Sequence, residues 1–322
     1  MMDVFIADQI PEQALQILRE NNLSFEMYQG EKLIDKATLL NKVASVKYLI
    51  TPLSTQVDQD IIDAAPNLQL IANFGAGTNN IDLDYAAQKG IPVTNTPFVS
   101  AVSTAEVTIG LMLALSHRMV EGDSLMRGAG FNGWAPLFFL GHQLEGKTLG
   151  IIGLGQIGQE VAKRMHAFDM KIVYTQRTQA PAELEEKLGA TYVTKDELLK
   201  QADIVTLHIP ATPATNHYLG EREFKLMKNS AILINAARGQ VIDEKLLPEM
   251  LNQKEIAGAA LDVYEAEPAV SDELKAMKNV ILTPHVGNAT VEARDAMAEI
   301  VAKNVCAVSK QETAKYIVND VK

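Results

Sequence analysis

Cysteine is almost absent from this sequence. Cys306 is the single cysteine among 322 residues, so no disulfide can form within one chain. Because Cys306 stands in an apolar helical pattern, we expect it to pack in the protein core rather than to act as a nucleophile. The chain must therefore be stabilised by hydrophobic burial, and its length allows two domains of ordinary size.

The sequence also lacks a long apolar run, a basic leader and an excess of positive charge. Its longest apolar run, residues 107–115, is too short to span a bilayer. No basic segment precedes an apolar stretch at the N-terminus, so no signal peptide is expected. The net charge of −11 disfavours nucleic acid and anionic membranes as partners. These absences predict a soluble, cytoplasmic protein.

Strand-like and helix-like segments alternate along most of the chain, which predicts an α/β fold with mostly parallel sheets. In the first part, strands are expected at 4–7, 25–28, 46–50, 68–73 and 91–94, and helices at 11–19, 35–43, 58–65 and 80–89. In the second part, strands are expected at 148–152, 171–175, 190–193, 204–208, 231–235, 256–261 and 280–283. Ligands bind such sheets at the carboxyl ends of the strands.

Two long helices and one irregular segment stand apart from this alternation. Residues 100–120 and 289–309 are expected to form long helices, the first of them buried on most sides. Residues 122–146 lack a regular pattern, yet they gather Phe131, Trp134, Leu137, Phe138 and Phe139. Because so many apolar side chains are unfavourable in water, we expect another protein surface to bury this segment, and we interpret it as a dimer arm. The alternative is a loop that packs on its own domain. Residues 316–318 are expected to pair with the first part.

The stretch 148–158 carries the strongest motif. An apolar run ends at Gly153, and Gly155 and Gly158 complete a GxGxxG spacing before a helical pattern. Gly153 permits a tight turn, Gly155 lets a pyrophosphate approach the backbone, and Gly158 lets the helix pack on the strand. The helix N-terminus adds N–H donors for phosphate. The motif predicts dinucleotide binding by Gly153, Leu154, Gly155, Gln156, Ile157 and Gly158. A glycine turn in another α/β unit is the alternative.

The next expected strand lacks the acid of an NAD-specific site. An Asp or Glu about 20 residues past the glycines usually holds the ribose hydroxyls of NAD. Here residues 171–178 read KIVYTQRT. Arg177 and Thr178 offer a cation and a hydroxyl where the 2′-phosphate of NADP would lie. We therefore expect NADP(H) as the preferred cofactor. In the alternative, Arg177 stacks on the adenine, and NAD(H) serves as well.

Arg238, Glu267 and His285 each follow one of the last three expected strands. Because the carboxyl ends of parallel strands meet at one edge of a sheet, we expect the three side chains to converge. Arg238 can hold a carboxylate through two N–H groups. His285 can pass a proton to a carbonyl oxygen as a hydride arrives, and Glu267 can hydrogen-bond the imidazole and favour its charged form. Taken singly, Arg238 could be a surface charge, His285 a loop histidine and Glu267 a solvated carboxylate.

Five stretches together resemble the D-isomer-specific 2-hydroxyacid dehydrogenase family, and within it the glyoxylate and hydroxypyruvate reductases. They are residues 73–82, 148–158, 235–239, 261–268 and 283–287. The resemblance implies that Arg238, Glu267 and His285 form a catalytic triad. It implies NAD(P)H-dependent reduction of a small 2-oxo acid to the D-2-hydroxy acid, with the proton coming from His285.

The same resemblance implies a domain plan and an assembly. Residues 1–99 plus 288–322 would form a discontinuous, flavodoxin-like substrate domain. Residues 100–287 would form a Rossmann dinucleotide-binding domain. A homodimer would form through the second domain, with Trp134 placed to reach the partner's substrate pocket.

Further site residues follow from the resemblance. The backbone N–H groups of Ala76 and Gly77 would bind the substrate carboxylate, with Leu53 and Ser54 nearby; a glycine-rich turn of donors is a reasonable anion site in its own right. His208 would lie either beside the cofactor or in ordinary strand-end packing. The remaining cofactor-binding residues would be Thr104, Pro210, Thr215, Ala236, Asp262 at the carboxamide, and Gly287, together with Arg238 and His285.

Several alternatives stay open at this point. Bulkier 2-oxo acids such as phenylpyruvate, or phosphoglycerate, could be the substrate, although the compact length disfavours a regulated phosphoglycerate enzyme. A dinucleotide-sensing co-repressor is the alternative from another class, and the complete triad argues against it. His117, His142, His166 and His217 show no metal-binding spacing with acidic neighbours, so no metal is expected.

Overall fold

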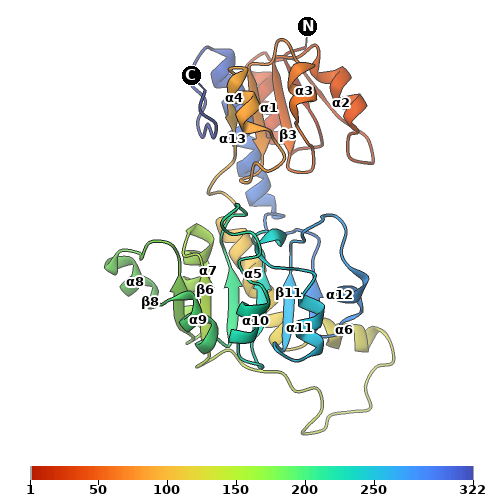
Figure 1. The fold of residues 1–322 in the computed structure, drawn as a ribbon. Helices are drawn as coiled ribbons and strands as arrows, with labels where there is room; N and C mark the ends of the chain where they lie inside the picture. Colours follow the sequence, from red (N-terminus) through yellow and green to blue (C-terminus); the bar gives the residue numbers. More distant parts are fainter. Residues whose placement is uncertain (1, 322) are drawn as a thin grey trace. The chain divides into compact units, whose positions relative to one another are not determined.

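Two separate parallel sheets divide the chain into two units (Figure 1). The structure is a computed structural model and describes residues 2–321. Unit 1 comprises Met1–Ser100 and Ala289–Lys322, and unit 2 comprises Ala101–Asn288. The α/β fold class predicted from the alternating pattern is confirmed. The assignment of substrate and dinucleotide domains to particular residue ranges stays a prediction.

Unit 1 is built on a five-stranded parallel sheet with the order β2-β1-β3-β4-β5, which is the flavodoxin-like order. The strands are β1 (Val4–Ile6), β2 (Phe25–Met27), β3 (Tyr48–Pro52), β4 (Leu70–Phe74) and β5 (Val93–Thr94). The helices are α1 (Glu12–Glu20), α2 (Lys36–Val43), α3 (Gln59–Asp63), α4 (Leu83–Gln88) and α13 (Val291–Ser309). Asp35, Asp58 and Asp82 cap three of these helices, each accepting a hydrogen bond from a backbone N–H in the first turn.

The C-terminal part of the chain returns to unit 1. Helix α13 packs against α1 and β4. Cys306 is buried on this helix, which confirms the expected packing role. Beyond it, Ile317 forms an antiparallel bridge with Thr94 of β5, and the N–H of Val318 donates to the carbonyl of Val93 at 2.9 Å. The expected pairing of residues 316–318 with the first part is therefore confirmed.

Unit 2 is built on a seven-stranded parallel sheet with the order β12-β11-β10-β9-β6-β7-β8. The strands are β6 (Thr148–Ile152), β7 (Lys171–Thr175), β8 (Ala190–Tyr192), β9 (Ile204–Leu207), β10 (Ile232–Asn235), β11 (Gly258–Leu261) and β12 (Val280–Leu282). The helices are α5 (Ala101–Ser116), α6 (Met119–Arg127), α7 (Gln156–His166), α8 (Ala182–Leu188), α9 (Lys195–Gln201), α10 (Glu221–Leu226), α11 (Leu247–Asn252) and α12 (Asp272–Ala276), with the 3₁₀ turn η1 (Gly239–Val241). The strand order reverses between β6 and β9, as in a Rossmann fold, and this switch point is where such folds bind dinucleotides.

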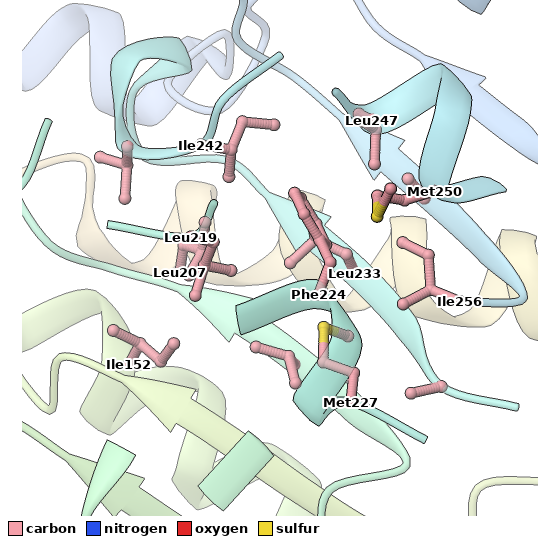
Figure 2. Packing of buried hydrophobic residues seen from close by; sticks show 14 of the residues in the cluster. Ile152, Leu207, Leu219, Phe224, Met227, Leu233, Ile242, Leu247, Met250 and Ile256 are labelled. Carbon is pink, nitrogen blue, oxygen red and sulfur yellow. The ribbon is translucent and has the colours of Figure 1, made fainter. Parts of the chain in front are cut away.

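The strands of unit 2 are apolar because helices cover both faces of the sheet. Figure 2 shows one of its two cores, where Leu207 and Leu233 of the sheet lie among Phe224, Met250 and other buried side chains. Such a packed layer holds the strand ends, and the loops that follow them, in fixed register.

The expected helix over residues 100–120 is confirmed for most of its length, but it ends early and a second helix begins at Met119. Helix α5 ends at Ser116, whose carbonyl accepts the N–H of His142 at 2.8 Å. The chain then turns at Arg118, which has φ +55°, and α6 begins. The Arg118 guanidinium pairs with Glu121 and lies over the ring of Phe139. Regular structure therefore continues into the segment expected to be irregular. Among residues 2–321, no helix is long and apolar enough to cross a membrane.

Candidate active site

The turn between β6 and α7 has the geometry that the GxGxxG spacing predicts. Gly153 has φ +98°, and a Cβ there would lie 2.5 Å from the carbonyl oxygen of His208. A Cβ on Gly158 would lie 2.2 Å from the carbonyl oxygen of Gly153. Gly155 differs, because its Cβ would meet no protein atom within 4 Å. Two glycines thus allow close packing, and the third leaves its backbone open to a ligand.

The start of α7 fits a phosphate group. Its N-cap is Gly155, which supplies no side-chain acceptor, so the first N–H groups of this 11-residue helix remain available. The preceding N–H, of Leu154, donates to Oε1 of Gln176 at 3.0 Å. The Nε2 of Gln176 donates in turn to the carbonyl of Thr178 at 2.8 Å. Gln176 therefore ties the glycine turn to the end of β7. This role of Gln176 was not predicted, although its position directly before Arg177 was a signal.

Arg177 and Thr178 lie directly after β7, next to β6 in the sheet. Both residues are exposed, and Arg177 makes no ion pair with any residue in the described range 2–321. The structure thus leaves a free cation at the strand end where a dinucleotide-binding fold holds the adenosine ribose. This arrangement fits a 2′-phosphate.

His208 follows β9 and adjoins the same glycine turn. Its Nε2 lies 3.1 Å from Oγ1 of Thr206. Its Nδ1 is shielded from solvent and has no hydrogen-bond partner among the described residues, although part of the residue is accessible. Burial lowers the pKa of His208 to about 3, so the imidazole is neutral near pH 7. An unpaired buried nitrogen beside the turn fits a site that receives a polar group from a ligand. In the following loop, Oγ1 of Thr215 donates to the carbonyl of Pro210 at 2.6 Å.

Arg238, Glu267 and His285 follow the neighbouring strands β10, β11 and β12. Nδ1 of His285 lies 2.8 Å from Oε2 of Glu267. The other carboxylate oxygen, Oε1, accepts the N–H of Tyr264 at 3.0 Å. Arg238 is close enough to interact electrostatically with Glu267. The structure therefore brings together the three side chains that the strand ends were expected to gather.

The charges of this group support one another. Burial by itself raises the pKa of Glu267, but hydrogen bonds from His285 and Tyr264, with the charges of His285 and Arg238, bring that pKa below its ordinary value. Burial lowers the pKa of Arg238, and Glu267 opposes that change. The carboxylate is thus ionised near neutral pH. It fixes the Nδ1 side of the imidazole, whereas Nε2 has no hydrogen-bond partner among residues 2–321.

Asp262 holds the loop that carries His285. It is buried, and its Oδ1 accepts from Oγ1 of Thr283 at 2.6 Å and from the N–H of Val286 at 2.8 Å. Its Oδ2 accepts the N–H of Gly287 at 2.8 Å. Both oxygens therefore orient this loop, in which His285 has φ +53°. The expected contact of Asp262 with a carboxamide stays a prediction.

Two other residues expected near the cofactor lie at this edge of unit 2. Thr104 is buried on α5, and a Cβ added to Gly287 would lie 3.3 Å from its Cγ2. Ala236 is buried directly after β10.

In unit 1, the loops after β3 and β4 are packed together. A Cβ on Gly75 would lie 2.5 Å from Cγ of Leu53, so the Leu53 side chain lies against the second loop. Nδ2 of Asn80 donates to the carbonyls of Pro52 at 3.1 Å and Thr55 at 3.0 Å, which joins the loops through a buried side chain. Asn80 was not predicted as a site residue, because its role depends on a contact between two loops that lie apart in the sequence.

The backbone of the second loop is shaped as an anion site. Nδ2 of Asn73 donates to the carbonyl of Gly77 at 2.6 Å and fixes the loop. Within residues 2–321, the N–H groups of Ala76 and Gly77 donate to no other protein group. Adjacent free N–H groups in a glycine turn form a natural anion-binding concavity.

His217 belongs to a cluster that the sequence analysis did not foresee. Its Nε2 lies 2.8 Å from Oε1 of Glu265, and its Nδ1 lies 3.7 Å from Oδ2 of Asp243. The acids are remote from His217 in the sequence, so a search for nearby ligands could not find them. Each ring nitrogen already faces a carboxylate, so the cluster is explained as a network of ion pairs. The expectation that no metal is bound stays a prediction.

Comparisons with known proteins agree with this geometry. The family model described as D-isomer specific 2-hydroxyacid dehydrogenase, NAD binding domain, matches residues 109–287. A protein of Staphylococcus haemolyticus that carries the name of a 2-hydroxyacid dehydrogenase is 52% identical over 319 residues, covering 99% of this chain and 100% of its own.

Two solved structures extend the comparison to the whole fold. An NADPH-dependent glyoxylate/hydroxypyruvate reductase of Sinorhizobium meliloti has a TM-score of 0.85 and 31% identity, covering 99% of this chain and 98% of its own. A D-lactate dehydrogenase of Aquifex aeolicus has a TM-score of 0.82 and 30% identity, covering 96% of each chain. The resemblance drawn from the five sequence stretches is thus confirmed, and the chain belongs to the D-isomer-specific 2-hydroxyacid dehydrogenase family of oxidoreductases.

Proposed function

We propose that this protein reduces a small 2-oxo acid, glyoxylate or hydroxypyruvate, to the D-2-hydroxy acid, with NADPH as the preferred reductant. The observation that carries the proposal is the 2.8 Å contact of His285 with Glu267 beside the Arg238 cation. The bound nicotinamide would supply the hydride. The glycine turn, the start of α7 and the partnerless nitrogen of His208 are the features that support its binding.

His285 is the proton donor in this proposal. Glu267 holds Nδ1 of the imidazole, so Nε2 is the nitrogen that gives a proton to the substrate carbonyl oxygen. The Glu267 carboxylate stabilises the imidazolium before transfer. In the oxidative direction, the neutral imidazole takes the proton back.

Each unit contains groups that suit a carboxylate. In unit 2, Arg238 presents a planar cation that suits the carboxylate and the carbonyl oxygen of a 2-oxo acid. In unit 1, the free N–H groups of Ala76 and Gly77, with Leu53 beside their loop, form a candidate anion site. A small substrate class is supported by the S. meliloti reductase, whose name states glyoxylate and hydroxypyruvate.

The choice of NADPH rests on Arg177 and Thr178. Both are exposed at the end of β7, and no acid occupies residues 171–178. The S. meliloti enzyme was solved with NADP and malonate, and the A. aeolicus enzyme with NAD and lactic acid, so both cofactors occur among the structural neighbours. The preference for NADPH over NADH is therefore argued from the residues of this chain.

Replacing Arg177 with alanine is expected to raise the KM for NADPH by about 10–150-fold, since a charged hydrogen bond contributes about 1.5–3 kcal/mol. The KM for NADH should change little, because NADH has no 2′-phosphate. Initial rates with both cofactors measure the effect. Lys171→Ala, at the opposite end of β7, is the matched control and should leave both values unchanged. Equal effects of Arg177→Ala on the two cofactors would contradict a phosphate contact.

The activity itself is tested with purified protein and a panel of 2-oxo acids. Oxidation of NADPH with glyoxylate or hydroxypyruvate, followed by absorbance, would support the proposal. Turnover only with phenylpyruvate or another bulky 2-oxo acid would show that the substrates are bulky rather than small 2-oxo acids. Absence of turnover with every acid in the panel would contradict the proposed reductase activity.

We also propose that the chain forms a homodimer through the arm expected at residues 122–146, and mainly through residues 128–146, which follow α6. Large apolar side chains are exposed there, and the residue exposure reaches 84% at both Trp134 and Leu137. Phe131, Phe138 and Leu140 extend the apolar surface. A patch of this kind on one chain favours a protein partner.

Sedimentation velocity at micromolar concentration is therefore expected to show a dimer. The double variant Trp134→Ser and Leu137→Ser should shift the species toward monomer, because the apolar area that drives association is lost. Leu33→Ser, an exposed leucine of unit 1, is the control and should leave the dimer intact. A wild-type monomer at this concentration would rule out the proposed assembly.

A further inference from the structure

Two neighbouring loops of unit 2 carry Arg238 and Glu267, and their backbones are in direct contact. We name residues 236–246 the arginine loop and residues 262–268 the glutamate loop. Gly239 of the arginine loop packs on the glutamate loop so closely that a Cβ would lie 1.9 Å from the carbonyl carbon of Tyr264. It would also lie 2.3 Å from the backbone nitrogen of Glu265. The position of one loop therefore determines the position of the other.

The side chains of Glu244 and Glu265 connect the two loops through hydrogen bonds. The N–H of Glu244 donates to Oε1 of Glu265 at 3.2 Å, and the N–H of Glu265 donates to Oε2 of Glu244 at 2.9 Å. Each side chain thus accepts the backbone N–H of the other residue. We name this reciprocal pair the glutamate clasp. Nε2 of Gln240 adds a longer bond to the carbonyl of Glu265 at 3.3 Å.

The clasp holds like charges close together. Burial raises the pKa of Glu244, and the neighbouring carboxylates of Glu265 and Glu267 raise it further, while the bond from the Glu265 N–H opposes them. The imidazole of His217 also contacts this pair, with its Nε2 2.8 Å from Oε1 of Glu265. The backbone hydrogen bonds therefore hold the loops against repulsion among three carboxylates.

We propose that Glu244 is a positioning residue for the reaction, because the glutamate clasp sets the place of Glu267 relative to Arg238. This inference rests on the proposed reductase function. Glu244 acts through the backbone of Glu265, which lies two residues before Glu267 in the glutamate loop. Glu267 in turn orients His285. A displacement of the glutamate loop would therefore disturb both Glu267 and the proton donor.

Three variants test the clasp. Glu244→Ala removes the acceptor, and kcat for glyoxylate with NADPH is expected to fall about 10–100-fold, the scale set by a displacement of about 1 Å in an active site. The KM for NADPH should change far less than kcat, because the glycine turn, the start of α7 and Arg177 lie outside both loops. Glu244→Gln should restore most of kcat, since its amide oxygen can still accept the Glu265 N–H. Glu249→Gln, at an exposed acid of α11 outside both loops, is the matched control and should leave kcat unchanged.

Hydrogen–deuterium exchange gives a readout that needs no substrate. Peptides covering residues 262–268 are expected to exchange faster in Glu244→Ala than in wild type, and at wild-type rates in Glu244→Gln. Thermal denaturation checks that each variant is folded. Should Glu244→Ala not fold, Glu244→Asp takes its place, because it keeps the charge but withdraws the acceptor by one methylene.

The outcomes separate this inference from the proposed function. An unchanged kcat and exchange rate in Glu244→Ala would overturn the positioning role. Equal impairment of Glu244→Gln and Glu244→Ala would also overturn it, because the hydrogen-bond acceptor would then not be what matters. A wild-type protein that reduces no 2-oxo acid would contradict the proposed function. The positioning role would fall with it, and the exchange rates would then decide only whether the clasp holds the loops.

Discussion

Replacing His285 with asparagine is expected to lower kcat for glyoxylate reduction by about 10²–10⁴-fold, the usual contribution of a positioned proton donor. Asparagine keeps a polar side chain of modest size but cannot deliver a proton to the substrate carbonyl. The affinity for NADPH should fall far less than kcat, because the glycine turn and Arg177 lie after other strands and keep their contacts. Initial rates and a fluorescence titration with NADPH measure the two quantities.

The matched control is His166→Asn, an exposed histidine at the end of α7, which should keep full activity. An unchanged kcat in His285→Asn would contradict the proposed proton donor. The acid limb of the wild-type pH profile gives an independent check. The pKa of Glu267 is lowered in the folded protein, so its stabilising contribution is present above its unfolded pKa and is lost as the pH falls through the lower folded value. Activity that depends on Glu267 should therefore persist to pH values below those at which an ordinary glutamate is protonated.

Replacing Gly239 with alanine is expected to cost about 1–3 kcal/mol of stability, the usual penalty for overpacking. It should also lower kcat about 10²-fold, because the new Cβ would force the arginine and glutamate loops apart. The clash is with backbone, at 1.9 Å from the carbonyl carbon of Tyr264, so rotation of a side chain cannot relieve it. Urea unfolding and initial rates measure the two effects.

Gly110→Ala is the control for this substitution. Gly110 lies within α5, and a Cβ there would meet nothing within 4 Å. Alanine should stabilise that helix by about 0.5–1 kcal/mol relative to glycine and leave kcat unchanged. Wild-type stability and activity in Gly239→Ala would show that the loops can move apart freely, which is the opposite of what their backbone contact implies.

Much of the architecture could be predicted because it follows from local pattern and from one rule of parallel sheets. Alternating strand and helix segments predicted the α/β fold. The glycine spacing predicted the turn before α7, because Gly153 and Gly158 stand where the backbone leaves no room for a Cβ. The meeting of His285 with Glu267 was predictable because carboxyl ends of neighbouring parallel strands share an edge. The family assignment depended on the same strand-end stretches.

The sequence by itself therefore determined the fold class, the family, and the candidate residues at the strand ends. Only the tertiary structure decided where α5 stops, because His142 and Phe139 come back from a distant segment to the turn at Arg118. It also decided that both oxygens of Asp262 hold the His285 loop, and that Glu244 and Glu265 clasp two loops together. The periodicity of apolar residues indicates which face of one segment is buried. A hydrogen bond between two loops depends instead on the register of the strands that carry them and on how closely their backbones approach, and neither can be predicted from one segment alone.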